Sequence, residues 1–451
     1  MKRISVVIIA ILTICAVRAA TPDWVKAKPS SLIYYTGVAS APVSDPDHKE
    51  TAKRLALSDI ASEISVEIES NSLMLREETN SQFNESFRQD IKTRAEAELE
   101  GYEFVDSYND GQRYWVYYQL DQQFYAELVA QRKIEATAKG LDFLTKGKQA
   151  MQQGFAANTI DLYAEGLKAV SSYVNQRLMT NIDNREIDVV TELYLSLSSA
   201  LDHFTISAMP EIIQVTSFNG EVHTIDVLAM LNGISAQGIK INANFTSGDG
   251  TFGSIPATDQ SGHSVIKVLR ISSKSTQQEI TISPAFDFSA LESDKLLAPF
   301  ASKLHAKIPS ANVRLEISAN DVLKAYIDSY GSLGMSFHNG LNTILNQQYF
   351  DVVESEEDAD VKILIKSSLR KGGTIRGEAY NMTEAFANAT ITITDLSNNR
   401  ILTTLNISDF RILSPENDSQ AQLYAKAARE AIKRLKPIMA NKFKELNISK
   451  K

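Results

Sequence analysis

Six histidines and a run of acidic residues are the side chains in this sequence whose types could do chemistry. Each histidine stands alone: His48, His203, His223, His263, His305 and His338. A zinc site would need two of them one helical turn apart or beside a cysteine pair. The sequence also contains neither a Gly-x-Ser-x-Gly nucleophile elbow nor a Gly-x-x-x-x-Gly-Lys phosphate loop. We therefore predict no catalytic residue, no metal site and no cofactor.

The densest acidic run could hold calcium through carboxylate oxygens. It comprises Asp351, Glu354, Glu356, Glu357, Asp358 and Asp360. An EF-hand loop needs alternating ligands and a central glycine, and the run has neither, so we interpret it as a solvated turn. Paired Asp or Glu carboxylates would also serve a carbohydrate-active hydrolase, although the separation that such a pair needs cannot be obtained from sequence. This enzyme class is the alternative to the non-enzymatic function predicted below.

Aromatic side chains in the first part of the chain are the candidate binding residues. They are Trp24, Tyr35, Tyr114, Trp115 and Tyr117. Such rings could form a surface on which sugar rings stack. Large side chains are also what strands use to fill a core, so both interpretations stay open.

A basic helix is predicted from Ser419 to Leu446, with its apolar residues on one side and its cations on the other. The cations are Lys426, Arg429, Lys433, Arg434, Lys436, Lys442 and Lys444. The basic side either contacts anionic lipid headgroups or wall polymer, or belongs to an ordinary amphipathic helix docked on a sheet. Pro437 predicts a kink.

The first residues predict export from the cytoplasm. Two basic residues precede an apolar run from Ile4 to Val17, and small residues follow it, so residues 1–20 have the pattern of a secretory signal peptide. The run is shorter than the ~20 residues that span a bilayer, and we expect no transmembrane helix in the mature chain. Cys15, the one cysteine, lies inside the run. A lipidation signal needs a small residue before the modified cysteine, and Ile14 is bulky, so plain cleavage is favoured over a lipid anchor.

Composition and periodicity predict a multi-domain α+β protein that does not bind nucleic acid. The 451 residues include 55 Asp and Glu against 46 Lys and Arg, whereas nucleic acid requires an excess of cations. We expect four domains after the signal peptide, at residues 21–132, 133–206, 207–290 and 308–451. They are an α+β module, a helical spacer, an immunoglobulin-like β-sandwich and a C-terminal α+β domain in the form of an α/β sandwich.

The first module is predicted from one strand, one helix and a hairpin. The strand is Leu32–Ala39, where Gly37 would let another backbone come close. The helix covers Ala52 to Ile68 with its apolar residues on one face, among them Leu55, and continues more weakly to about Leu99. The hairpin joins Tyr102–Val105 to Tyr114–Leu120 across Asn109-Asp110-Gly111.

These segments, together with Pro22-Asp23-Trp24, resemble the LPP-twenty lipoprotein family of bacterial envelope proteins over about residues 21–131. The resemblance implies a small secreted or outer-membrane-attached α+β module. It also implies a binding or assembly role and supplies no catalytic residues.

The spacer and the sandwich are predicted because the spacing of apolar residues changes from helical to strand-like near Pro210. Helical spacing between residues 133 and 203, with breaks near 155–158 and 181–184, fits three helices. Five short strand candidates between turns then predict the sandwich. They are Ile212–Val215, Ile225–Ala229, Ile239–Phe245, Val265–Leu269 and Glu279–Ile282. The turn Ala257–Val265 resembles one found in immunoglobulin-like envelope repeats and in carboxypeptidase-regulatory-like modules.

The last segment is predicted to alternate strands and helices. The expected elements are the strand Val313–Ile317, the helix Tyr326–Leu345, the strands Phe350–Val353, Val361–Ile365 and Ala389–Thr394, and the closing helix. Through Tyr349–Glu354 and Ala359–Ile363, this order resembles the amino-terminal domain of the Tol translocation protein and the curli secretion channel fold. That resemblance implies an envelope location.

These observations together predict a non-enzymatic bacterial cell-envelope protein in the periplasm or at the outer membrane or cell surface. Its terminal α+β modules would contact envelope proteins or components of the cell wall and outer membrane. The two middle segments would space them.

Overall fold

The computed structural model describes residues 21–69, 92–93, 96–174, 176–182, 184–377 and 381–450. The predicted signal peptide with Cys15, and most of the predicted extension of the first helix toward Leu99, lie outside these residues. The described chain combines helices with several separate sheets in more than one domain, and it contains no closed barrel, which confirms the predicted α+β class.

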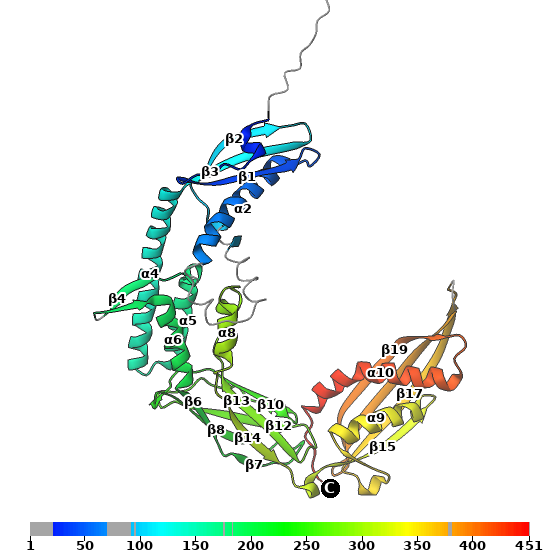
Figure 1. Cartoon of the computed structure of the whole chain (residues 1–451). Coiled ribbons are helices and arrows are strands. Elements are labelled where there is room, and N and C mark those ends of the chain that lie inside the picture. Colours follow the sequence, from blue (N-terminus) through cyan, green and yellow to red (C-terminus); the bar gives the residue numbers. More distant parts are fainter. Residues whose placement is uncertain are drawn as a thin grey trace, which may run out of the picture. The chain divides into compact units, whose positions relative to one another are not determined.

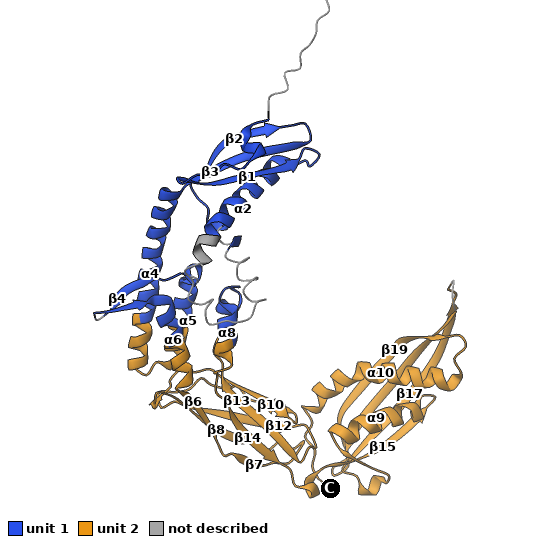
Figure 2. Ribbon diagram, in the orientation of Figure 1, with its two compact units in different colours: residues 1–144, 164–195, 289–302 blue, residues 145–163, 196–288, 303–451 orange. Residues whose placement is uncertain are grey.

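The chain forms two compact units, coloured separately in Figure 2. The first unit comprises Met1–Leu144, Ala164–Leu195 and Ser289–Ser302. The second comprises Thr145–Tyr163, Ser196–Phe288 and Lys303–Lys451. The limit between the sandwich and the C-terminal domain is corrected below by the position of residues 311–316, and the other domain limits given above remain predictions.

The first module is a three-stranded antiparallel sheet with one long helix on it (Figure 1). The strands are β1 (Tyr34–Pro42), β2 (Glu103–Asn109) and β3 (Arg113–Asp121), in the order β1-β3-β2. β2 and β3 confirm the predicted hairpin. The short helix α1 (Asp23–Lys26) precedes the sheet, and α2 (His48–Glu69) packs on β1 and β3.

α2 approaches β1 closely because Gly37 has no side chain. A Cβ at Gly37 would lie 2.1 Å from the carbonyl oxygen of Ala56 and 2.8 Å from Cγ1 of Ile60, so the predicted close approach of another backbone is confirmed. Ala52, Ala56 and Ile60 are fully buried, as their spacing predicts. Leu55 was expected on the same face, but it is 41% exposed because it lies at the margin of the buried stripe.

Helices dominate the next segment. The elements are α4 (Gln122–Gln152), α5 (Ala156–Ala169), η2 (Ser171–Tyr173), β4 (Met179–Ile182), β5 (Arg185–Asp188) and α6 (Val189–Asp202). The three predicted helices are confirmed. At the expected break near 181–184 the chain forms an antiparallel hairpin, β4-β5, which was not predicted.

Two sheets form the β-sandwich. One has the order β10-β13-β14-β7 and the other β11-β12-β8-β6, with β9 paired to β8. The strands are β6 (Phe204–Met209), β7 (Ile212–Gln214), β8 (His223–Leu231), β9 (Ile234–Ser235), β10 (Ile241–Ser247), β11 (Gly250–Phe252), β12 (His263–Ile271), β13 (Gln277–Pro284) and β14 (Ala311–Glu316). All five strand candidates are confirmed. Buried and exposed residues alternate along β8, β12 and β13, so each sheet turns one face to a shared core.

β14 corrects one expectation. From the sequence, Val313–Ile317 opens the C-terminal domain, and this is wrong, because β14 lies between β13 and β7 in the sandwich. Val313 and Leu315 are fully buried there. The helices α7 (Ser289–Glu292) and α8 (Ala298–His305) separate β14 from β13 along the chain. The local spacing of apolar residues can indicate a strand, but it cannot show that the strand pairs with others across such an insertion.

The C-terminal domain is a five-stranded sheet with two helices packed on it (Figure 1). The strand order is β16-β15-β17-β18-β19, in which β15 is parallel to β16 and β17 and the remaining pairs are antiparallel. The elements are η3 (Ala319–Asp321), β15 (Lys324–Gly331), α9 (Gly334–Gln348), β16 (Asp351–Val353), η4 (Glu356–Asp358), β17 (Val361–Ile375), β18 (Met382–Asp395), β19 (Arg400–Pro415) and α10 (Gln420–Phe443).

Two features of this domain differ from expectation. The helix predicted over Tyr326–Leu345 is wrong in its first part, because Tyr326 to Gly331 complete β15 and α9 begins only at Gly334. β19 was not predicted, because its apolar residues do not alternate regularly with polar ones. The closing helix is confirmed as α10, where Ser419 and Gln422 form a capping box.

Candidate functional site

The aromatic residues of the first module are divided between the two faces of its sheet. Successive side chains of a strand point to opposite faces. On β3, Tyr114, Val116 and Leu120 point toward α2, and the last two are almost fully buried. Trp115 and Tyr117 therefore lie on the opposite face, which we call the outer face.

Three of the five candidate binding residues gather on the outer face. Trp24 of α1 packs on Tyr117 of β3, with ring centroids 5.9 Å apart. Trp115 lies two residues before Tyr117 on the same strand and is half-buried. α1 and β3 therefore bring Trp24, Trp115 and Tyr117 together.

The other two candidates pack on the α2 side of the sheet. Tyr35 meets Tyr125 edge to face at a centroid distance of 6.1 Å. Tyr114 meets the ring of His48 at 5.5 Å. Both tyrosines contact the buried clusters beneath α2, which is the core-filling role left open above.

Two outer-face residues were missed from the sequence. Tyr108 of β2 lies directly opposite Trp115, and Asp106 lies opposite Tyr117. The register of the hairpin was the signal that could have found Tyr108, because directly paired residues share a face. The same register also places Asp106 opposite Tyr117, because the shift in β2 lies beyond it, between Phe104 and Asp106.

Carboxylates hold the two indole rings in place. Trp24 donates its Nε1–H to Asp106 at 3.0 Å, and Trp115 donates its Nε1–H to Asp110 at 3.4 Å. Backbone hydrogen bonds from Arg113 and Gln112 hold the pKa of Asp110 below its usual value. Asp110 is therefore ionised at neutral pH.

Arg113 completes this surface. Its guanidinium lies 6.0 Å from the ring centroid of Trp115 and donates to Oγ and the carbonyl oxygen of Ser40 at 2.8 and 2.9 Å. Because β1 fixes the guanidinium, the cation is oriented before any ligand arrives. We call Trp24, Tyr108, Trp115 and Tyr117 the outer aromatic patch; its indole donors are occupied, so its rings offer stacking and apolar contact.

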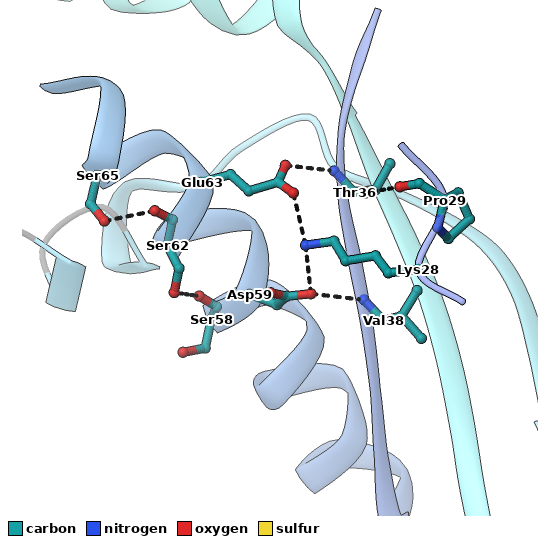
Figure 3. Close-up of polar contacts among 9 residues, drawn as sticks. All are labelled: Lys28, Pro29, Thr36, Val38, Ser58, Asp59, Ser62, Glu63 and Ser65. Carbon is teal, nitrogen blue, oxygen red and sulfur yellow. Dashed lines mark hydrogen bonds and ion pairs between the residues drawn. The ribbon is translucent and has the colours of Figure 1, made fainter. Parts of the chain in front are cut away.

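In the same module, two carboxylates of α2 cover the free edge of β1 (Figure 3). Glu63 accepts the backbone N–H of Thr36 and Asp59 accepts that of Val38, each at 3.2 Å. Lys28 bridges both carboxylates at 2.8 Å. Burial lowers the pKa of Lys28, but hydrogen bonds and charges from Asp59 and Glu63 outweigh burial and raise it above its usual value. The two carboxylates thus accept hydrogen bonds from N–H groups that would otherwise be available to pair with another strand.

Neither a metal cluster nor a membrane-spanning helix is found among the described residues. No three His, Cys, Asp or Glu side chains there are grouped so that they could hold a metal ion. The acidic run near residues 351–360 includes the turn η4, where Glu356 pairs with Lys362 at 2.7 Å. None of the helices in that part of the chain is long and apolar enough to cross a bilayer.

The first module has relatives. The model of the LPP20 lipoprotein family matches residues 22–121. The match contains α1, β1, α2, β2 and β3, and so includes both the outer aromatic patch and the closed β1 edge. It confirms the resemblance of this LPP20-like module, whereas the resemblance of the C-terminal segment to Tol and curli proteins stays a prediction.

Solved structures resemble parts of the chain only distantly. A candidate lipoprotein from Caulobacter crescentus CB15 is 15% identical, with 27% of this chain and 89% of that chain covered at a TM-score of 0.20. A lipoprotein from Neisseria meningitidis is 11% identical, with 26% and 99% covered at a TM-score of 0.18. Likeness at these scores supports no inference about function. No curated protein matches the chain.

Proposed function

We propose that the chain is an exported, non-enzymatic protein of the bacterial cell envelope whose LPP20-like module binds another envelope protein through the outer aromatic patch. The match of residues 22–121 to a lipoprotein family and the signal-peptide pattern of residues 1–20 support the location. The grouping of Trp24, Tyr108, Trp115 and Tyr117 on the face away from α2 is the observation that carries the binding role.

The composition of the patch favours a protein partner over a sugar. Tryptophan, tyrosine and arginine are the residues that dominate the binding energy of protein interfaces. Here Arg113 lies beside Trp115 and is held by Ser40, so little entropy is lost when a partner binds. The indole N–H groups already donate to Asp106 and Asp110, whereas sugar recognition would use such donors for hydroxyl groups.

The sandwich serves as a spacer in this proposal. Its sheets, β11-β12-β8-β6 and β10-β13-β14-β7, have the strand orders of the two immunoglobulin sheets. This order supports the immunoglobulin-like assignment made from the sequence. Domains of that architecture commonly position the domains next to them and carry no chemistry of their own. This agrees with the sequence, from which no catalytic residues are predicted.

Crosslinking in living cells tests the binding role. A photoreactive amino acid replaces Tyr108 in the full-length protein, and a second strain carries it at Met335, a 74% exposed position on α9. We expect a discrete crosslinked envelope protein from position 108 that is absent from position 335. Adding Tyr117→Ala should abolish the adduct, whereas Tyr330→Ala, at a 56% exposed tyrosine of β15, should not.

Three results would contradict the proposal. They are the same adducts from both positions, an adduct at 108 that survives Tyr117→Ala, and capture of glycan strands in place of protein. Circular dichroism of the purified variants checks that each one is folded.

A further inference from the structure

α10 carries a single stripe of positive charge opposite its buried face. Eight residues of α10 are buried against the C-terminal domain: Leu423, Ala427, Ala428, Ala431, Ile432, Leu435, Met439 and Phe443. Lys426, Arg429, Lys433 and Lys436 follow one another at spacings of three and four residues, so they lie along one side of the helix. That side is turned away from the domain core. The stripe extends over roughly 15 Å at 1.5 Å per residue.

The stripe is poorly neutralised by the protein itself. Between Gln420 and Lys444 the chain has seven Lys or Arg and one acid, Glu430. Lys426, Lys433 and Lys436 take part in none of the ion pairs found among the described residues, and Arg429 meets only Glu430, at 3.9 Å. The neighbouring helix α9 contains neither Asp nor Glu.

Repulsion among these cations lowers the stability of α10 when no anionic partner is bound. Like charges three or four positions apart on a helix destabilise it. The chain as a whole has a formal net charge of -9, so a local run of unpaired cations departs from its general acidity. An anionic surface that binds the stripe would relieve this repulsion.

We propose that the α10 stripe docks the C-terminal domain on the anionic phospholipid surface of a membrane. Three of its four cations are lysines, whose ammonium groups act as mobile point charges and suit a diffuse layer of headgroups better than one bidentate ligand. A helix lying flat places all four cations at the same surface. Screening limits their reach to about 8 Å at physiological ionic strength, so the acidic groups of distant domains do not cancel them. The proposal does not depend on the outer aromatic patch.

Vesicle binding tests this docking surface. The whole mature chain is sedimented with vesicles of phosphatidylethanolamine and phosphatidylglycerol, and with vesicles of phosphatidylcholine. We expect binding to the first kind alone, and its loss at high salt. The substitutions Lys433→Gln and Lys436→Gln together should weaken binding about tenfold or more, because each cation near an anionic surface contributes about fivefold. Lys240→Gln with Lys267→Gln, at two exposed lysines of the sandwich, is the control and should leave binding unchanged.

Several outcomes would overturn the proposal. They are no binding to the anionic vesicles at low salt, equal binding to phosphatidylcholine, and equal weakening by the stripe and control substitutions. Binding confined to purified cell-wall sacculi, or to another protein, would assign the stripe to a different partner. All the substituted lysines are exposed, so thermal unfolding followed by circular dichroism should show that neither variant is less stable than the wild type.

Discussion

Gly37 shows how one missing side chain sets the distance between a strand and a helix. The carbonyl oxygen of Ala56 lies where a Cβ would be, at 2.1 Å, and a carbonyl in the middle of α2 cannot move without the helix. The alanines at 52 and 56 are small for the same reason, and both are fully buried. Close contact between backbones therefore substitutes for large apolar side chains in this half of the module.

Replacing Gly37 with alanine should destabilise the first module by about 2 kcal/mol, in the range found for overpacked cores. Both tryptophans, Trp24 and Trp115, lie in this module, so tryptophan fluorescence during urea unfolding reports on it alone. Gly373→Ala, on β17 with no atom within 4 Å of the added Cβ, is the control and should not shift that transition. An unchanged midpoint for Gly37→Ala would contradict the packing argument.

At the residue scale the sequence identified the aromatic residues but not their faces. Tyr114 and Trp115 are neighbours on one strand, so they point in opposite directions, and only the position of α2 decides which one is covered. Trp24 could not be assigned to the outer face from its position before β1. Its place depends on contact with Tyr117, a residue far along the chain.

At the scale of elements, β1 is an edge strand whose open side is closed by a helix. On that side Glu63 and Asp59 accept the backbone N–H groups of Thr36 and Val38, and Lys28 bridges the two carboxylates, as Figure 3 shows. Charged groups at an edge are a common protection against pairing with another chain. The spacing of Asp59 and Glu63 puts them one turn apart, so each reaches a different N–H along the strand.

The double substitution Asp59→Ala with Glu63→Ala should open this edge and promote self-association. It removes the acceptors for Thr36 and Val38, and free edge N–H groups are templates for strand pairing. Sedimentation velocity over a range of concentrations should show larger species than for the wild type. Asp59→Asn with Glu63→Gln keeps an acceptor oxygen at both positions and should behave like the wild type. Equal sedimentation of all three proteins would show that the carboxylates do not guard the edge.

Elements with strong local signals were predictable, and those defined by distant pairing were not. The β2-β3 hairpin and α10 follow from a turn sequence and an amphipathic pattern. Part of β15 was predicted as the start of a helix, because the apolar residues Tyr326 and Ile327 fit the helical spacing of the apolar residues in α9. β19 was missed because its apolar residues do not alternate regularly with polar ones: Ile401 is exposed and Ser414 is buried. The strand is defined by its pairing with β18.

At the scale of the whole molecule, the sandwich is built from segments that are not continuous in the chain. Eight of its strands lie between Phe204 and Pro284, but β14 begins only at Ala311, after α7 and α8. Most of that insertion, Ser289–Ser302, belongs to the other compact unit. The domain limit expected near residue 290 therefore falls before a central strand of the sheet. Periodicity could show strands on both sides of the insertion but not that they pair.

A fragment of residues 207–290 should consequently fail to fold, whereas residues 203–318 should fold. The shorter fragment lacks β14, which leaves β13 and β7 without their shared neighbour and exposes Ile280 and Ile282, both fully buried in the intact chain. It also loses half of β6, the partner of β8 at the edge of the second sheet. Uncovering several core side chains costs about 1.5 to 3 kcal/mol for each, enough to consume the stability of a small domain. Urea unfolding followed by circular dichroism should show a cooperative transition for the longer fragment alone, and a cooperative transition in residues 207–290 would mean that β14 is dispensable.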